Sequence, residues 1–238
     1  MEYSRDFFIL GTPVSTEIGK CHFIKLKDYP QYVNDLSQIA QSKEEIIYNF
    51  QNQNKFGQLD NLINDLKASS LLDIVNVMEQ LKNAYLRVFT KVFNNSDVFA
   101  SINEDNFYRI RKLILDMHCI REAKVSKNPE LERFNQKSRA LKSENKTDFS
   151  DLVTCVVQFT GYSAADVLDL TLPQLHSHFF RGAAFLNNHA AVIFSTVSPD
   201  AAKNIGAWSQ HIDLFEEEKH YISDGEAKNL EKLFSDKN

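Results

Sequence analysis

The 238-residue sequence has only seven glycines and five prolines, fewer than the roughly 7% and 5% that are usual in proteins. Sheet-rich proteins with many tight turns generally use more of both residues. The shortage therefore argues against an all-β architecture and favours a mainly helical protein. The length suits one large domain or two small ones.

Cysteine and positive charge are also scarce. Three cysteines without paired close spacing, Cys21, Cys119 and Cys155, indicate free thiols in a reducing compartment. A net charge of −5 argues against nucleic acid or an anionic membrane as a partner. The N-terminus lacks a secretory signal, and the longest apolar candidate, residues 182–197, falls short of the roughly 20 residues of a membrane span.

The segment LGTPVSTEIGKCHFIKL has the glycines and lysine of a phosphate-binding loop, but not their spacing. Such a loop needs four residues between its glycines, then lysine and a hydroxyl residue. Seven residues separate Gly11 from Gly19, Cys21 follows Lys20, and Pro13 lacks an N–H for a phosphate. We therefore expect a β connection here, with short strands in DFFIL and CHFIKLKDY.

After Tyr29 the apolar residues recur at three- and four-residue spacing, as in amphipathic helices. Residues 71–93 are predicted to form one long helix that ends at Asn94. Gly161 is predicted to end another. Residues that favour helix starts are Ser42, Asn103, Asn128, Ser163, Thr171, Ser198 and Ser223. The predicted fold class is mainly α, with a small N-terminal β-hairpin element, and it could divide into two helical subdomains.

The charge distribution predicts how the chain is organised. Between residues 121 and 146 there are eight Lys/Arg and four Asp/Glu, in a segment containing ELERFNQKSRALK. This pattern is typical of a solvated helix. We expect a β element over 1–28 packed on a helical domain over 29–120, a polar connecting helix over 121–147, and a C-terminal helical domain over 148–238.

No residue pattern meets the requirements of catalysis. His176 and His178 are two apart on an expected helix, where their side chains point about 200° apart and cannot share a metal ion. His118 and Cys119 diverge for a similar reason. We expect no catalytic residue, metal or cofactor. The alternative from another class is an enzyme with an unrecognised helical active site at His176, His178 and Cys155.

The stretch WSQHIDLFEEEKHYI is the strongest candidate for contact with a partner. Trp208, His211, Ile212 and Phe215 follow helical spacing on one stripe, and an acidic run lies beyond them. Such a stripe either packs on its own domain or binds a partner. We predict these four residues as the partner-binding set.

The order of four segments resembles tail assembly chaperones of long-tailed, siphovirus-type phages and prophages of Gram-positive bacteria. These segments are FILGTPVSTEIGKCHFIKLKDYP, NPELERF…KSRAL, TGYSAADVLDLTLPQLHSHF and WSQHIDLFEEEK. The resemblance covers most of the chain and includes no catalytic motif. It implies a mainly helical, non-enzymatic protein of the infected host's cytoplasm that is absent from the mature virion.

The resemblance also implies two partners. Such chaperones coat the long, aggregation-prone tape measure protein, and a longer frameshifted form often recruits tail tube subunits. The protein could also form a homo-oligomer. Within non-enzymes, the alternative is a structural neck or connector subunit that stays in the virion.

Overall fold

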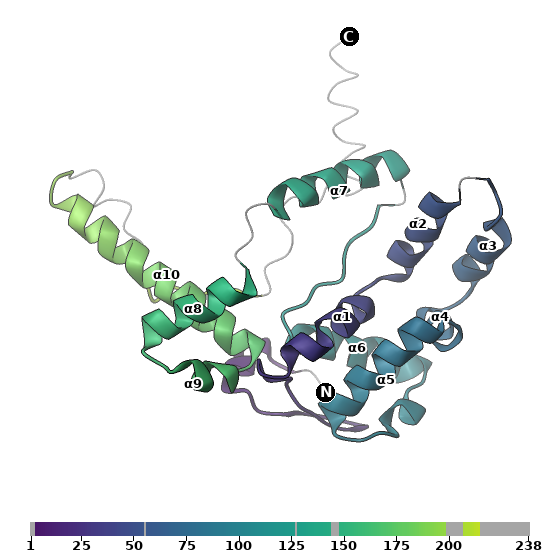
Figure 1. The fold of residues 1–238 in the computed structure, drawn as a ribbon, viewed down its shortest axis with the longest axis horizontal. Coiled ribbons are helices and arrows are strands. Elements are labelled where there is room, and N and C mark those ends of the chain that lie inside the picture. The colour runs from purple at the N-terminus through teal and green to yellow at the C-terminus, as the bar shows by residue number, and fades with distance from the viewer. Residues whose placement is uncertain (1–2, 55, 127, 144–147, 199–206, 215–238) are drawn as a thin grey trace, which may run out of the picture.

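The computed structural model describes residues 3–54, 56–126, 128–143, 148–198 and 207–214 (Figure 1). In these ranges helices dominate, and a short two-stranded antiparallel hairpin lies near the N-terminus. The predicted fold class, mainly α with a small N-terminal β-hairpin element, is confirmed.

The elements up to residue 117 are η1 (Arg5–Leu10), β1 (Val14–Thr16), β2 (Gly19–Cys21), α1 (Tyr29–Ile39), α2 (Lys43–Gln53), α3 (Asp60–Ala68), α4 (Leu71–Val77), α5 (Glu79–Phe93), η2 (Val98–Ser101) and α6 (Glu104–Met117). The later elements are α7 (Pro129–Ser143), α8 (Phe149–Thr160), α9 (Ala164–Leu168) and α10 (Leu172–Ser195). In Figure 1, α8, α9 and α10 form one group beside the group of α1 to α6.

The hairpin lies where the sequence predicted a connection between strands. The strand positions predicted in DFFIL and CHFIKLKDY are wrong, because DFFIL forms the 3₁₀ helix η1 and both strands lie between Gly11 and Cys21. The η1 turn buries Phe8 in the core, while the Arg5 guanidinium pairs with Asp116 at 2.8 Å. Gly11 ends η1 with φ of 65°, which L side chains rarely adopt.

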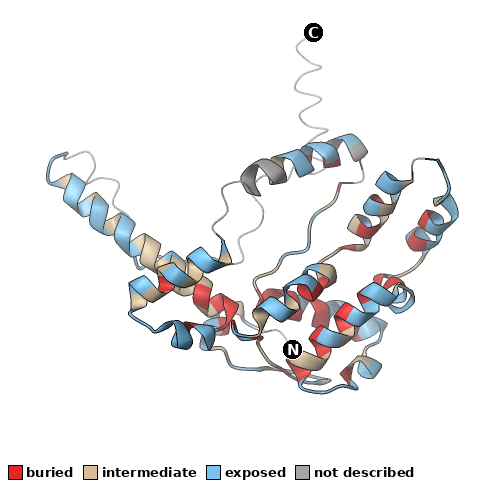
Figure 2. Ribbon diagram, in the orientation of Figure 1, coloured by how far each residue is buried: buried red, intermediate tan, exposed pale blue. Residues whose placement is uncertain are grey.

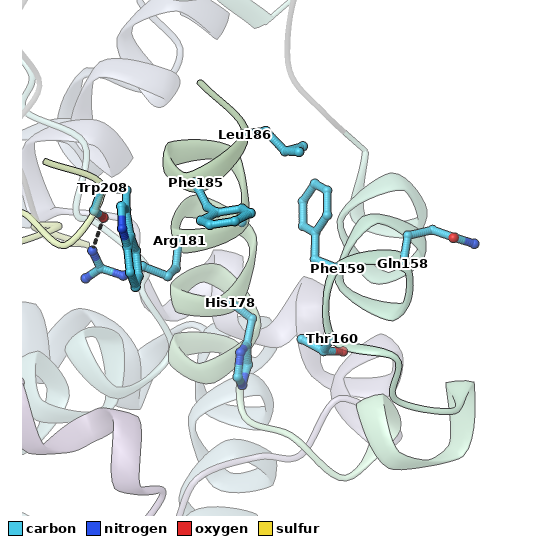
Figure 3. A pocket seen from close by; sticks show the side chains of 9 residues that line it. Gln158, Phe159, Thr160, His178, Arg181, Phe185, Leu186 and Trp208 are labelled. Atoms are coloured by element: carbon cyan, nitrogen blue, oxygen red, sulfur yellow. Dashed lines mark hydrogen bonds between the residues drawn. The ribbon is translucent and has the colours of Figure 1, made fainter. Parts of the chain in front are cut away.

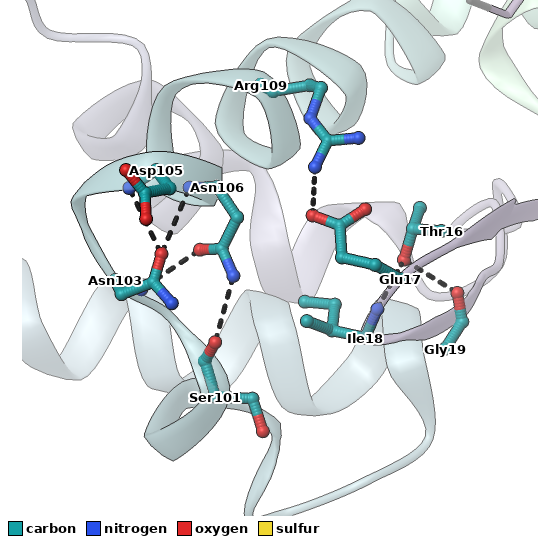
Figure 4. A network of polar contacts seen from close by, with 9 residues as sticks. All are labelled: Thr16, Glu17, Ile18, Gly19, Ser101, Asn103, Asp105, Asn106 and Arg109. Atoms are coloured by element: carbon teal, nitrogen blue, oxygen red, sulfur yellow. Dashed lines mark hydrogen bonds and ion pairs between the residues drawn. The ribbon is translucent and has the colours of Figure 1, made fainter. Parts of the chain in front are cut away.

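The hairpin is closed by local hydrogen bonds, shown in Figure 4. Thr16 is paired with Gly19, and its hydroxyl donates to the Gly19 carbonyl at 2.7 Å. The same hydroxyl oxygen accepts from the N–H of Ile18 at 3.3 Å. The backbone of this segment is therefore used in a strand pair, as a hairpin requires.

Residues 22–28, which we call the joint segment, form hydrogen bonds with both groups of helices. The N–H of His22 donates to the carbonyl of Val92, and that of Leu26 donates to the carbonyl of Leu170 at 2.9 Å. These partners lie on different parts of the chain, so the segment does not form the strand that its sequence predicted. Ile24 is buried in one hydrophobic cluster and Leu26 in another.

The larger cluster lies among the helices before residue 118, and the smaller one lies around α8, α9 and α10 (Figure 2). The smaller cluster has five buried members: Leu26, Val156, Val167, Leu172 and Leu175. Leu26 of the joint segment thus completes this cluster together with residues of α8, α9 and α10. The predicted division of the chain near residue 147 stays a prediction.

Most predicted helix ends are confirmed. The side chains of Ser42, Asn103, Ser163 and Thr171 each accept a backbone N–H of the following turn, as N-caps do. Asn94 and Gly161 end α5 and α8 in the left-handed conformation. The helices predicted after Ser198 and Ser223 lie outside the described residues.

The prediction of one long helix over residues 71–93 is wrong. Met78 has extended backbone dihedrals, with φ of −85° and ψ of 102°, and separates α4 from α5. Its side chain packs against the larger cluster, whereas the neighbouring Val77 is exposed. The packing of Met78 outweighs the local preference for a continuous helix.

The helix α7 contains the polar segment whose helical structure was predicted. Its Asn128 cap accepts from the N–H of Glu130 at 3.0 Å. Glu132 is fully buried, and its carboxylate accepts from the N–H of Ser126 at 2.8 Å and from Arg139 at 2.9 Å. A buried carboxylate needs such partners, so this pair ties α7 to the segment before it.

Candidate partner-binding surface on helix α10

The helix α10 is anchored firmly at its N-terminal end. Thr171 and Gln174 form a reciprocal capping box, and Leu172 and Leu175 are buried in the smaller cluster. The Gln174 side-chain amide also donates to the carbonyl of Ile9 at 3.0 Å, which links α10 to η1. The start of this 24-residue helix is therefore fixed from two sides.

The C-terminal half of α10 projects away from the other helices (Figure 1) and is largely exposed (Figure 2). Large apolar side chains remain in contact with solvent there, including Phe185 at 51%, Ile193 at 56% and Phe194 at 64% exposure. We define the α10 tip surface as Phe185, Leu186, Val192, Ile193 and Phe194. Arg181 is the only residue of α10 with a full charge.

The tip surface occupies a broad arc of the helix. At 100° per residue its five side chains span about 200° of the circumference. Asn188, Ala191 and Ser195 lie on the other side and are partly buried. Exposed helices of globular proteins normally present polar side chains to water. His189 is the exposed polar side chain within this arc, between Phe185 and Ile193. An otherwise apolar arc of this size marks an interaction surface.

A cavity of about 420 Å³ lies beside this surface, between the end of α8, α10 and residues 207–214 (Figure 3). Its apolar wall is formed by Phe159, Phe185, Leu186 and Trp208. Its polar lining includes Thr160, His178 and Arg181. The cavity extends the tip surface toward α8.

Residues 207–214 are held against α10. Nη1 of Arg181 donates to the carbonyls of Trp208 at 2.6 Å and Gln210 at 2.9 Å. The indole of Trp208 lies edge-on to the ring of Phe185, with their centroids 5.8 Å apart. Two hydrogen bonds and one aromatic contact therefore join this segment to the helix.

The helical stripe predicted from Trp208 onward is wrong in its described part. Trp208, His211 and Ile212 lie in turns and irregular backbone, and Arg181 donates to the carbonyls of Trp208 and Gln210 in this segment. His211 is exposed and Ile212 is partly buried. Phe215 lies outside the described residues. The role of these four residues as partner contacts stays a prediction.

The structure gives His176 and His178 separate aromatic neighbours. His176 lies 6.2 Å from the ring of Phe180 and His178 lies 5.7 Å from Tyr162, both edge-on. Burial lowers the pKa of both imidazoles. Cys155 lies on α8, and no hydrogen bond to either histidine is found for it in the described part of the chain. Within the same ranges no three His, Cys, Asp or Glu side chains could hold a metal ion together.

Sequence reasoning did not assign a role to the buried His118. Its Nε2 accepts from the N–H of Ile24 at 3.1 Å, and its Nδ1 donates to the carbonyl of Ile114 at 2.7 Å. Burial lowers the pKa of His118 to about 4, so the imidazole is neutral. Burial also raises the pKa of the Cys21 and Cys119 thiols to about 12, which suppresses thiolate chemistry.

No helix in the described ranges, α10 included, has the length and apolarity needed to cross a membrane. The structure thus defines a mainly helical protein with a small N-terminal hairpin and an exposed apolar helix tip. The chain belongs to the YomV N-terminal domain family, which matches residues 2–127.

The relationship extends beyond that domain. The chain is 42% identical over 236 residues to the SPbeta prophage-derived uncharacterized protein YomV of Bacillus subtilis (strain 168). The match covers 98% of this chain and 99% of that protein. No solved structure matches the chain. The expected link to phages and prophages is therefore confirmed, whereas a role in tail assembly stays a prediction.

Proposed function

We propose that this protein is a non-enzymatic tail assembly chaperone. It binds and shields the tape measure protein in the infected host's cytoplasm and helps to recruit tail tube subunits. The observation that supports this most directly is the α10 tip surface, a wide apolar arc on a projecting helix with a single charge. The prophage origin of the relative and the order of sequence motifs are consistent with this role.

The chemistry of the tip surface suits an apolar helical client. The tip surface contains two rows of side chains at seven-residue spacing. One row is Phe185 and Val192, and the other is Leu186 and Ile193. A client helix can lie along either row. Because the tip offers no full charge, the matching face of the client is apolar rather than charged. As tube subunits polymerise around the client, they displace the chaperone from these faces.

The size of the surface favours weak, reversible binding by each copy. Fully burying a large apolar side chain contributes about 1.5–3 kcal/mol, so each half-exposed residue adds roughly 1 kcal/mol. Five such residues supply roughly 5 kcal/mol, from which the cost of association is subtracted. A long client therefore needs many copies along its length, and reversible binding permits their later release.

The test is co-purification from cells that express this protein with the tape measure protein of the same phage. The double variant Ile193→Asp, Phe194→Asp puts two charges on the tip and is expected to lower the recovered client at least about tenfold. Both side chains are largely exposed, so the fold tolerates the change.

Phe56→Asp provides the matched control, because Phe56 is 86% exposed and lies between α2 and α3. It should leave client recovery unchanged. Circular dichroism should be the same for all three proteins. Equal recovery with the double variant and the wild type would contradict the assignment of the tip as the client surface.

A further inference from the structure

Residues 207–214, which we call the strap, are tied to the body of the protein by two arginines. Arg181 of α10 donates to two strap carbonyls, those of Trp208 and Gln210. Arg121, which follows α6, donates to the carbonyl of Leu214 at 3.4 Å. The strap is thus fastened near its start and near its end.

The strap covers part of the α10 tip surface without packing tightly on it. Trp208 contacts Phe185 edge-on, yet both rings remain about half exposed. The cavity of about 420 Å³ lies between the strap, α8 and α10. This pocket is open to solvent, and Trp208 lines it together with Phe185, so the strap covers only part of the apolar surface (Figure 3).

We propose that the strap is an internal competitor that shields the Phe185 side of the α10 tip surface until a client displaces it. This inference rests on the proposed function. Arg181 is the latch, because it donates hydrogen bonds to two carbonyls of the strap. With such an internal cover, the apparent association constant for the client equals the intrinsic constant multiplied by the fraction of molecules in which the strap is open.

The latch also limits what can take the place of the strap. When the strap leaves, Arg181 loses two carbonyl acceptors beside an apolar surface. Burying an unpaired guanidinium is unfavourable, so we expect the client to cover the Phe185 side of the tip and to leave Arg181 in contact with water.

The closed state of the strap can be measured without a client. Trp208 is the only tryptophan of the chain, so intrinsic fluorescence reports directly on the strap. Arg181→Gln should shift the Trp208 emission to longer wavelength and increase the binding of the apolar dye ANS. Arg87→Gln is the matched control, since Arg87 also donates to a carbonyl, that of Gln31, far from the strap.

The decisive measurement is the affinity for the tape measure protein of the same phage. Arg181→Gln should bind it about tenfold more tightly than the wild type, while Arg87→Gln should not change the affinity. Trp208→Ala leaves α10 intact and should also bind more tightly. If Trp208 instead contacts the client, as the sequence predicted, Trp208→Ala should bind more weakly.

The outcomes separate the two proposals. If the wild type binds the client and neither Arg181→Gln nor Trp208→Ala binds more tightly, the strap proposal is overturned and the chaperone proposal stands. Unchanged emission and ANS binding in Arg181→Gln also overturn the strap proposal. If the wild type and both variants fail to bind the client, both proposals are overturned.

Discussion

The ring of Phe159 lies directly against the backbone of Gly182. A Cβ atom at Gly182 would be 2.3 Å from Cδ2 of Phe159, far inside van der Waals contact. This glycine therefore lets the end of α8 approach α10 closely. The contact forms one wall of the cavity beside the strap.

The first prediction follows from this contact. In an unobstructed helix, replacing glycine by alanine stabilises by about 0.5–1 kcal/mol. Gly182→Ala should instead destabilise the protein by about 1–3 kcal/mol, because Phe159 must move. Urea unfolding measures the difference. In a Phe159→Ala background the same change should become stabilising, and a loss of similar size in both backgrounds would refute the steric explanation.

The second prediction concerns the loss of folding stability at acidic pH. His118 has a pKa of about 4 in the folded protein and about 6.5 when unfolded, so below pH 6.5 the unfolded chain binds a proton that the folded protein excludes. This contribution to stability is complete above pH 6.5 and decreases as the pH falls toward 4. It should cost about 2 kcal/mol between pH 6.5 and 5.

The control for this effect is His118→Gln, whose amide can donate to Ile114 and accept from Ile24 in the same places. Urea unfolding of both proteins across this pH range isolates the imidazole from other titrating groups. The wild type should lose about 2 kcal/mol more than the variant over the interval. Parallel pH profiles would show that His118 does not titrate as described.

The third prediction concerns Arg111 of α6, which is buried and reaches the C-terminal end of α1. Its guanidinium donates to the carbonyls of Ile39 at 2.9 Å and Gln41 at 3.0 Å, to Tyr85, and to Glu122. Arg111→Met removes all of these hydrogen bonds from a buried site and should destabilise the protein by about 3 kcal/mol or more.

Arg109 on the same helix provides the comparison. It forms an ion pair with Glu17 of the hairpin turn at a partly exposed site (Figure 4). Exposed pairs contribute about 0–1 kcal/mol, so Arg109→Met should have a small effect in the same thermal or urea unfolding experiment. Similar losses for both variants would contradict the special role of Arg111.

The fourth prediction concerns the virion. A chaperone leaves the tail as tube subunits assemble, so mass spectrometry of purified particles should not detect this protein. The lysate of the same infected or induced cells should contain it. A fixed number of copies in every particle would favour the neck or connector alternative instead.

Local chemistry made much of the fold predictable. Ser42, Asn103, Ser163 and Thr171 satisfy backbone N–H groups within three residues, so their sequence context alone determines the helix start. Asn94 ends α5 by its own left-handed conformation. Such interactions require no knowledge of the rest of the chain.

The features that sequence reasoning missed depend on distant partners. Arg5, which directly precedes the predicted strand DFFIL, pairs with Asp116, which lies 111 residues away. The described part of the stripe from Trp208 onward is not helical, and two of its carbonyls accept from Arg181, which lies 27 and 29 residues earlier. The apolar run on α10 was visible in the sequence. Its exposure could not be predicted, because it depends on how the other helices pack in space and leave the C-terminal half of α10 projecting (Figure 1).

The joint segment gives the position of Leu26 a practical consequence. The family match ends at residue 127, yet Leu26 and Cys119 pack with residues of α8, α9 and α10. A fragment cut at that boundary would open this cluster to water and expose more of the Cys119 thiol, which is partly buried in the intact chain. In the intact chain, the rate at which an alkylating reagent modifies Cys119 would therefore report how often the two groups of helices separate.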